Sequence, residues 1–505
     1  MISLTHISLT DIMWRDLVWG VALSRLGSPD AIMLNPVDFG GRPFHFIGVG
    51  GIGMSALAYV LTQRSLPVSG SDLRGNRLTQ RLEGMGARFF LGQTADNIRT
   101  LVPDQGTASE SLPQVVCSTA IPKENPEYQA AIAAGCPIFH RSDILAGIMT
   151  QYRGIAIAGT HGKTTTSSAL GQTLLHAGLD PTAIVGGEVP EWGGNAHLGE
   201  SDWLVAEADE SDGSLVKLTA EIGVITNIEL DHPDHYDSLE SVIGIFRTFE
   251  GNCKTLVGSL DCPTVRSHFK PDITYSLSRE SGATYTADAI ELGGQGAAAD
   301  IYENGDRLGR LQLQLLGEHN LSNALAVVAV GRQLGLEFAD LAAGLGTFSG
   351  AKRRFEHRGS AGEIDFYDDY AHHPSEIRVT LAAARQRLQT LATAAGQAQR
   401  VVAVFQPHRF SRVAAFLDEF ATAFTDAHQV IVTDVYAAGE KNVVGLDGAA
   451  VAKAIATHHP AVTYQGELSA VVTGLVEMLQ PGDLVIFLGA GNLNQIIPTV
   501  LEQVA

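Results

Sequence analysis

The chain has few cysteines and lacks any long apolar run. Its four cysteines, Cys117, Cys136, Cys253 and Cys262, lie at least nine residues apart and include no C-x-x-C pair. They fit reduced structural thiols better than a metal site or a disulfide scaffold. No stretch approaches about 18 uninterrupted apolar residues, which excludes a membrane-spanning helix. Residues 1–41 carry charges where a signal peptide needs an apolar core, so we expect a cytoplasmic protein.

Positive charge is also scarce. The sequence has 34 Lys and Arg against 55 Asp and Glu, a formal net charge of -21. Nucleic acids and anionic membranes bind positively charged surfaces, so we expect neither as a partner. An anionic small molecule would need local basic clusters, and these occur at residues 352–354 and 408–412. The chain shows no internal repeat or coiled coil, and no low-complexity tract apart from an Ala/Gln/Thr-rich stretch at 388–399. Its 505 residues indicate two to four globular domains.

The most informative segment is a glycine-rich loop at residues 158–166, with the sequence AGTHGKTTT. It follows an apolar run at 154–158, of the buried-strand type, and precedes a helical pattern. Unpaired backbone N–H groups and the helix dipole favour a phosphate there, while Lys163 adds charge and Thr164 offers a hydroxyl to Mg2+. The first glycine of the generic motif is replaced by Ile157. We predict a nucleoside triphosphate site with a shortened loop.

Strands and helices alternate along three blocks of the chain. We predict an α/β fold with three domains: a Rossmann-like domain at 37–141, a central phosphate-loop domain with a mostly parallel sheet at 142–351, and a Rossmann-like domain at 352–505. An N-terminal extension at 1–36 is expected to be disordered.

A second glycine loop occupies residues 48–53 in the first block. It has the pattern G-x-G-x-x-G, between a buried-type strand at 44–47 and a predicted helix at 54–66. Asp72 ends the next strand, about twenty residues further on. Spacing alone predicts an NAD-type dinucleotide site, although the same loop suits any diphosphate. Ser118 follows another strand, at the edge where open α/β sheets bind ligands.

Two strands of the central block end in acidic residues, at 203–212 and at 224–232. Carboxylates directly after buried strands are costly unless a cation or a hydrogen-bond network meets them, so we predict Mg2+ ligands beside the phosphate loop. Residues 300–316 alternate like a hairpin, with Asn304 and a glycine at the turn. The cap-rich segment 317–324 begins a further helix.

The third block places histidines and arginines after its strands. Residues 401–405 form an apolar strand that leads into a segment with His408, Arg409 and Arg412, and residues 368–374 carry two histidines before a proline. Clustered His and Arg at strand ends suit the recognition of carboxylate or phosphate, because the guanidinium group binds such anions in a bidentate manner.

In this order the motifs resemble the Mur ligases, the ATP-dependent amide-forming enzymes of peptidoglycan precursor assembly. The resemblance covers nearly everything after about residue 36 and is strongest to the members that join L-alanine to UDP-N-acetylmuramate. It rests on segments 48–55, 159–164, 207–212, 226–228, 231–232, 353–355, 368–374 and 405–412, and on Gly317, His319, Asn320 and Asn323. The shortened phosphate loop is the form that this family uses.

The resemblance implies that the first glycine loop holds the UDP part of a sugar nucleotide, which replaces the NAD interpretation. The residues expected to bind UDP-sugar are Gly48, Gly50, Gly51, Gly53, Met54, Ser55, Asp72 and Ser118. Those expected to bind ATP are Gly159, Thr160, His161, Gly162, Lys163, Thr164, Thr165, His319, Asn323 and Arg353. One or two Mg2+ ions are expected at Thr164, Glu207 and His232.

By the same resemblance, the amino acid and the reacting carboxylate are placed by Tyr370, His372, Arg409 and Arg412. The residues expected to act in catalysis are Lys163, His232, His372, Arg409 and Arg412. The implied reaction passes the γ-phosphoryl group of ATP to the lactyl carboxylate of UDP-N-acetylmuramate, and the amine of L-alanine then displaces phosphate. A monomer or weak homodimer is expected.

Some family members carry a carbamylated lysine at a second metal site. The comparable helix here has Arg247, which cannot form a carbamate, so the number of metal ions stays open. Three other functions are alternatives for this sequence. A murein-tripeptide ligase would share the nucleotide motifs, but a tyrosine is expected there at the position of Ser211. An NAD-dependent oxidoreductase leaves the loop at 159–166 unexplained, and a non-catalytic nucleotide-binding regulator is the third alternative.

Overall fold

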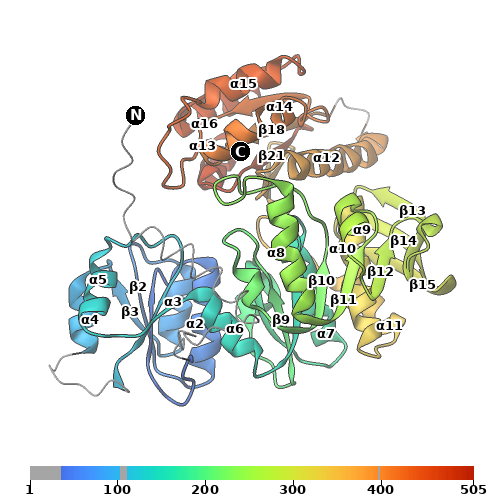
Figure 1. Cartoon of the computed structure of the whole chain (residues 1–505). Coiled ribbons are helices and arrows are strands. Elements are labelled where there is room, and N and C mark those ends of the chain that lie inside the picture. Colours follow the sequence, from blue (N-terminus) through green and yellow to red (C-terminus); the bar gives the residue numbers. More distant parts are fainter. Residues whose placement is uncertain (1–35, 103–110, 396–398) are drawn as a thin grey trace, which may run out of the picture. The chain divides into compact units, whose positions relative to one another are not determined.

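A computed structural model describes residues 36–102, 111–395 and 399–505. The extension predicted over residues 1–36 lies outside these ranges, apart from Pro36. The described chain contains three β-sheets, of five, ten and six strands (Figure 1). None of the described helices is long and apolar enough to cross a membrane.

The first sheet is parallel throughout, with the spatial order β3-β2-β1-β4-β5. Its elements are β1 (Phe44–Ile47), α2 (Ile52–Gln63), β2 (Val68–Asp72), α3 (Arg77–Gly84), β3 (Arg88–Leu91), α4 (Ala95–Leu101), β4 (Gln114–Cys117), α5 (Pro126–Ala133), β5 (Ile138–His140) and α6 (Arg141–Met149). The strand order reverses beside β1, and the crevice at such a switch point is where open α/β sheets bind ligands. Helix α2 ends before the predicted residue 66, because Ser65 has a left-handed backbone (φ 61°) and Pro67 follows.

The second sheet has the order β15-β14-β13-β12-β11-β10-β6-β9-β7-β8. Its pairs are parallel except for β7–β8, β13–β14 and β14–β15. Its elements are β6 (Arg153–Ala158), α7 (Lys163–His176), β7 (Thr182–Val189), β8 (Gly194–His197), β9 (Trp203–Glu207), β10 (Ala220–Ile225), α8 (Leu239–Gly251), β11 (Cys253–Ser259), α9 (Pro263–His268), β12 (Ile273–Ser276), β13 (Tyr285–Gly293), β14 (Gly296–Glu303), β15 (Asp306–Leu313), α10 (Glu318–Gln333) and α11 (Phe338–Thr347). The predicted hairpin is β14 and β15, which turn at Asn304 and Gly305.

The second sheet has a large apolar core on the face covered by α7, α10 and α11. Leu170 and Leu174 of α7 and Leu325 of α10 are fully buried there against strand residues such as Val224. Close packing needs small residues. A Cβ at Gly171 of α7 would lie 2.9 Å from the Trp192 ring. This packing holds the first turn of α7, and therefore the phosphate loop, in a fixed place on the sheet.

The third sheet has the order β16-β17-β21-β18-β19-β20 and is parallel except for β16–β17. Its elements are β16 (Glu356–Ala361), β17 (Ile364–Asp369), α12 (Pro374–Ala395), β18 (Val401–Phe405), α13 (Phe410–Ala415), α14 (Leu417–Ala421), β19 (Gln429–Val432), α15 (Gly448–Ala456), β20 (Val462–Tyr464), α16 (Leu468–Met478), β21 (Leu484–Leu488) and α17 (Ile497–Val504).

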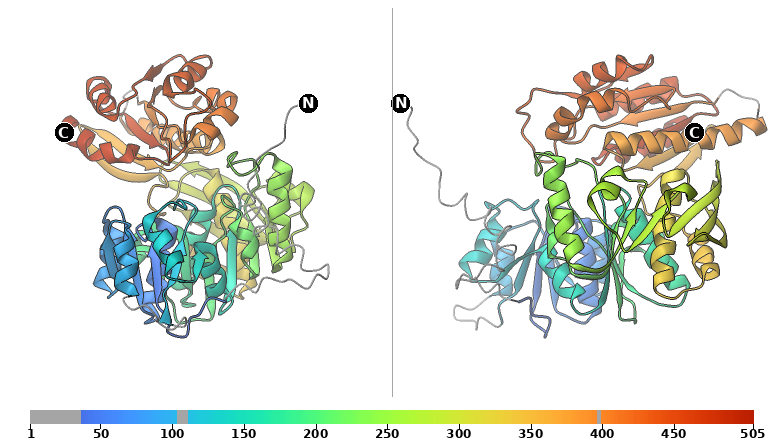
Figure 2. Two further views of the ribbon diagram at one scale, coloured as in Figure 1. Left: turned by 60° about the vertical axis from the view of Figure 1, so that its left-hand side comes forward. Right: turned by 45° about the vertical axis from the view of Figure 1, so that its right-hand side comes forward.

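Strand β18 shows why this sheet is covered on both faces. Its residues are all apolar and fully buried, and successive side chains point to opposite faces. Val401, Ala403 and Phe405 join one core with α12 to α15, whereas Val402 and Val404 join a second core with α16 and α17. Helices accordingly lie on both sides of the strands (Figure 2).

Candidate active site

The phosphate loop follows β6, whose neighbours in the sheet are β9 and β10. All three strands run parallel, so their carboxyl ends meet at one edge. Glu207 closes β9 and Thr226 follows β10, and both therefore lie beside the loop. The acidic strand ends predicted from the sequence are thus brought to the phosphate loop by the strand order.

Two glycines give the phosphate loop its shape. Gly159 and Gly162 have φ values of 141° and 82°, which favour glycine. A Cβ at Gly159 would lie 1.9 Å from Thr226 Oγ1, and one at Gly162 would lie 2.6 Å from Asn323 Oδ1 of α10. The N–H of His161 donates to Asn227 Oδ1 at 2.8 Å. Thr226, Asn227 and Asn323 therefore hold the loop from two sides.

Lys163 begins α7 and lies among carboxylates. Its Nζ is 2.6 Å from Glu210 Oε2 and donates to the Gly159 carbonyl oxygen at 2.7 Å. Burial works to lower the pKa of Lys163, but the charges of Glu210, Asp209 and Glu207 outweigh it, so the pKa is raised. The ammonium group is therefore charged at neutral pH and stands at the helix start where a phosphate would bind.

The segment after β9 carries opposed charges. Burial raises the pKa of Glu210 to about 7, against the influence of Lys163. The pKa of Asp209 is lowered, because Arg141 and Lys163 outweigh the effect of burial. Arg141, the first residue of α6, donates to Asp209 at 2.9 Å and to Asp212 at 3.0 Å. This segment is thus held by one cation on each side.

The predicted metal residues are brought together in part. Thr164 Oγ1 donates to Glu207 Oε2 at 3.0 Å. His232 Nε2 lies 3.8 Å from Glu210 Oε1, and the other oxygen of Glu210 pairs with Lys163, the residue before Thr164. Both carboxylate oxygens of Glu210 are buried with no hydrogen-bond partner beyond their ion pairs. A hydroxyl and carboxylate oxygens are ligands that Mg2+ prefers, so the donor set fits this ion.

Of the other predicted ATP residues, Asn323 and His319 lie on the first turns of α10. Asn323 packs against Gly162, as described above, whereas His319 is packed against Gly317. Burial lowers the pKa of His319 to about 4, so the ring is neutral at pH 7. Arg353 lies elsewhere. It donates to the Gly489 carbonyl oxygen at 2.6 Å and stacks over the Tyr370 ring in the C-terminal part.

The predicted amino-acid residues gather where β17, β21 and β18, neighbours in the third sheet, end. The His372 ring lies 5.4 Å from the Tyr370 ring and 5.8 Å from the His408 ring, between centroids. Arg412 has 1% exposure and donates from Nε to Asp231 Oδ1 at 2.9 Å. Arg409 pairs with Asp234. Both arginines therefore meet the segment that follows β10.

Burial governs the histidines of this region. It lowers the pKa of His372 and of His373 to about 4, and that of His408 to about 2. These rings are neutral at pH 7. The positive charge available to an anionic substrate here is therefore carried by the arginines.

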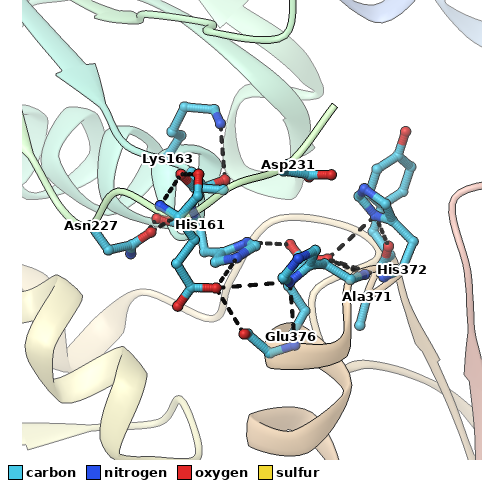
Figure 3. A network of polar contacts seen from close by, with 12 residues as sticks. His161, Lys163, Asn227, Asp231, Ala371, His372 and Glu376 are labelled. Carbon is cyan, nitrogen blue, oxygen red and sulfur yellow. Dashed lines mark hydrogen bonds and ion pairs between the residues drawn. The ribbon is translucent and has the colours of Figure 1, made fainter. Parts of the chain in front are cut away.

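His161 points away from its own loop, towards the C-terminal part (Figure 3). Its Nε2 is 3.4 Å from Glu229 Oε2 and its Nδ1 is 3.4 Å from Glu376 Oε1. Burial works to lower the pKa of His161, but the two carboxylates raise it to about 10. Donor atoms of His161, Glu229 and His373 lie within 4.8 Å of one another, close enough for a metal ion. The positive charge of the protonated His161 ring already balances the carboxylates of Glu229 and Glu376, so this cluster needs no metal ion.

The predicted UDP-sugar residues meet around the first glycine loop. The N–H of Gly50 donates to Asp72 Oδ2 at 2.9 Å, so Asp72 orders the loop. Ser118 stands in the turn after β4, and Ile121 of that turn would lie 3.3 Å from a Cβ at Gly48. Gly51, Gly53, Met54 and Ser55 form the start of α2. A Cβ at Gly53 would lie 3.3 Å from Arg141 Nη1.

Sequence profiles match three successive parts of the chain. Residues 43–153 match the Mur ligase family catalytic domain, 157–331 the Mur ligase middle domain, and 353–491 the Mur ligase glutamate ligase domain. A UDP-N-acetylmuramate--L-alanine ligase of Nostoc punctiforme is 58% identical over 477 residues, which cover 93% of this chain and 98% of the relative. The chain belongs to the Mur ligase family.

Further relatives agree with this assignment. A UDP-N-acetylmuramate--L-alanine ligase of Acaryochloris marina is 60% identical, over 93% of this Mur ligase and 97% of the relative. The crystal structure of UDP-N-acetylmuramate-alanine ligase MurC from Thermotoga maritima superposes with a TM-score of 0.76 at 27% identity, covering 92% and 98% of the two chains. A murein peptide ligase of Psychrobacter arcticus shares the fold, with a TM-score of 0.68 at 20% identity over 92% and 99% of the chains.

These comparisons confirm the predicted family and the three-part α/β fold. The domain boundaries at residues 141 and 351 and the roles of the individual site residues stay predictions. The structure adds four polar residues that the sequence prediction left out: Arg141, Asn227, Glu229 and Glu376. Asn227 lies in one of the segments that carry the resemblance, and Glu229 lies between two of them. Arg141 and Glu376 gave no signal, because they act from helix starts that only the fold brings to the site.

Proposed function

We propose that this Mur ligase uses ATP to join L-alanine to the lactyl carboxylate of UDP-N-acetylmuramate, with release of ADP and phosphate. The observation that carries the proposal is the high identity, over nearly the full length, to relatives named UDP-N-acetylmuramate--L-alanine ligase. The charged Lys163 at the start of α7 supports it, because such a loop suits a triphosphate.

In the first step, a carboxylate oxygen of the sugar nucleotide attacks the γ-phosphorus of ATP and ADP leaves. Negative charge gathers on the transferred group, and Lys163 is placed to offset it. Thr164, Glu207 and His232 would hold Mg2+, which supplies further positive charge at the phosphates when it is bound. The phosphate loop, fixed by Asn227, holds these groups in place before the reaction.

In the second step, the amine of L-alanine attacks the carbonyl carbon of the acyl phosphate, the C–O bond to phosphate breaks, and the amine loses a proton. Arg409 and Arg412, with the neutral His372, are proposed to place the amino acid and the acyl group. Arg412 is suited to this because Asp231 fixes its guanidinium orientation. Enclosure of the site would keep water from the acyl phosphate.

Substrate-dependent ADP release tests the proposal. Protein, ATP, Mg2+ and UDP-N-acetylmuramate are mixed with single amino acids, and L-alanine is expected to give the largest release. Equal or greater turnover with glycine, L-serine or a murein tripeptide would reassign the substrate. ADP release that needs neither sugar nucleotide nor amino acid would remove the ligase proposal altogether.

The proposal also covers the metal ions, the oligomeric state and the location of the protein. One or two Mg2+ ions, a monomeric or weakly dimeric state and a cytoplasmic location are all expected of the same enzyme. Titration of ADP release with Mg2+ and sedimentation of the purified protein test the first two. The tripeptide-ligase alternative has weaker support, because the murein peptide ligase of Psychrobacter arcticus is 20% identical, against 58% for the L-alanine ligase of Nostoc punctiforme.

A further inference from the structure

Glu376 lies in the first turn of α12, and its carboxylate contacts residues on two sides (Figure 3). Its Oε2 accepts the backbone N–H groups of His372 at 3.0 Å and of His373 at 3.3 Å. The same oxygen is 3.3 Å from His372 Nδ1. Its Oε1 is 3.4 Å from His161 Nδ1. One carboxylate therefore contacts the phosphate loop and the segment proposed to bind the amino acid.

The His161 side of this contact is charged. The ring lies between the carboxylates of Glu376, which is 14% exposed, and of Glu229, which is 44% exposed, so water screens the Glu376 contact less. Ser375 Oγ donates to Glu229 Oε2 at 2.8 Å, which also joins α12 to the segment that follows β10. The backbone of His161 is part of the loop, two residues before Lys163. Any displacement of the loop therefore moves a charge that Glu376 holds.

We infer that Glu376 is a positioning residue, which orients His372 for the amino acid and ties that orientation to the phosphate loop through His161. The inference rests on the proposed function. Glu376 itself is not proposed to touch a substrate. Its effect passes through the main chain and ring of His372 on one side and the ring of His161 on the other.

Helix capping alone is the simpler role for the same residue. Pro374 is the first residue of α12, and a glutamate at the third position commonly accepts the N–H of the residue before the helix. Glutamine serves that cap as well as glutamate does. Replacement by glutamine therefore keeps the cap and removes the charge that faces His161, which separates the two roles.

The experiment compares Glu376→Gln with Glu376→Ala and with Glu467→Gln in the full-length protein. Glu467 precedes α16 in the same part of the chain and makes no side-chain cap bond, so it is a matched control. We expect Glu376→Gln to raise the KM for L-alanine about tenfold, which corresponds to about 1.4 kcal/mol, because the charge that faces His161 is lost while the cap is kept. Its affinity for a fluorescent ATP analogue is expected to stay near wild type. Its melting temperature should fall by less than that of Glu376→Ala, which loses the cap as well as the charge that faces His161.

A double-mutant cycle tests the connection to the loop. His161→Gln is expected to raise the KM for L-alanine as well, and the double variant should be no worse than Glu376→Gln alone. Effects that simply multiply, or a Glu376→Gln enzyme whose KM for L-alanine equals that of Glu467→Gln, would overturn the inference. A wild-type enzyme without L-alanine-dependent ADP release would instead sink the proposed function.

Discussion

Replacing Lys163 with methionine tests the central part of the site. The change removes the ammonium group and keeps most of the apolar stem. In the absence of substrates, Lys163 is paired with Glu210 at 2.6 Å. Because the pKa of Glu210 already stands at about 7 beside the lysine, its carboxyl will take up a proton once the cation is gone. The fold therefore survives the substitution, and the loss falls on catalysis.

The size of that loss follows from the charge it removes. A fixed donor to the charge that develops in a transition state is worth about 3–4 kcal/mol, a factor of about 100 to 1000 in kcat. ADP release at saturating substrates should fall by that factor. Lys217→Met is the matched control, because Lys217 also makes a 2.6 Å ion pair, with Asp143, in a more exposed place. That variant should keep near wild-type activity.

Two results would refute this reasoning. One is a folded Lys163→Met enzyme that keeps more than about a tenth of wild-type kcat, since the factor expected from one such donor is far larger. The other is an equal loss in Lys217→Met, which would show that any lysine removed from this domain has the same effect. Unchanged binding of UDP-N-acetylmuramate checks that the first domain is intact.

The remaining predictions concern the loop and its charge. Gly162→Ala should weaken binding of a fluorescent ATP analogue at least tenfold, because its Cβ would lie 2.6 Å from Asn323 Oδ1 at a φ of 82°. Gly178→Ala is the control: Gly178 has a φ of 81° but no atom within 4 Å of an added Cβ, so this variant has the backbone strain without the clash. It should bind the ATP analogue as tightly as wild type. Folding raises the pKa of His161 from 6.5 to about 10, so its protonated ring stabilises the fold fully below pH 6.5 and this stabilisation disappears as the pH rises through 10. The urea midpoint should therefore fall less between these pH values in His161→Gln than in wild type, and an equal fall would contradict the assignment.

Local patterns in the sequence carry much of the fold. The apolar run before Gly159 and the helical pattern after Thr166 mark a strand, a loop and a helix, which the structure shows as β6 and α7. The alternation around Asn304 is enough for a hairpin, because register and turn are set by neighbouring residues. Such features depend on interactions within a few residues, and single-sequence reasoning reaches them.

The order of strands in a sheet cannot be predicted from local sequence patterns. Nothing in the spacing shows that β9 and β10 flank β6, and this order is what brings Glu207 and Thr226 to the loop. The pair Asp231–Arg412 joins residues 181 positions apart, and Arg141 meets Asp212 across 71 positions. Each of these pairs is set by packing between distant helices and strands. The sequence indicates polar residues at the ends of strands and helices, but it does not show which residues they contact.

A strongly acidic protein that binds anionic substrates must neutralise its own carboxylates at the site. In the structure, Arg141 and Lys163 lie beside the carboxylates that follow β9, and Arg412 lies beside the carboxylate of Asp231, which follows β10. While Lys163 is paired with Glu210, part of its positive charge is neutralised and less of it acts on a phosphate. A divalent cation at Thr164 and Glu207 would add the missing positive charge beside both groups. We therefore expect nucleotide and metal to bind this site more tightly together than either would alone, because each would relieve the charge that opposes the other.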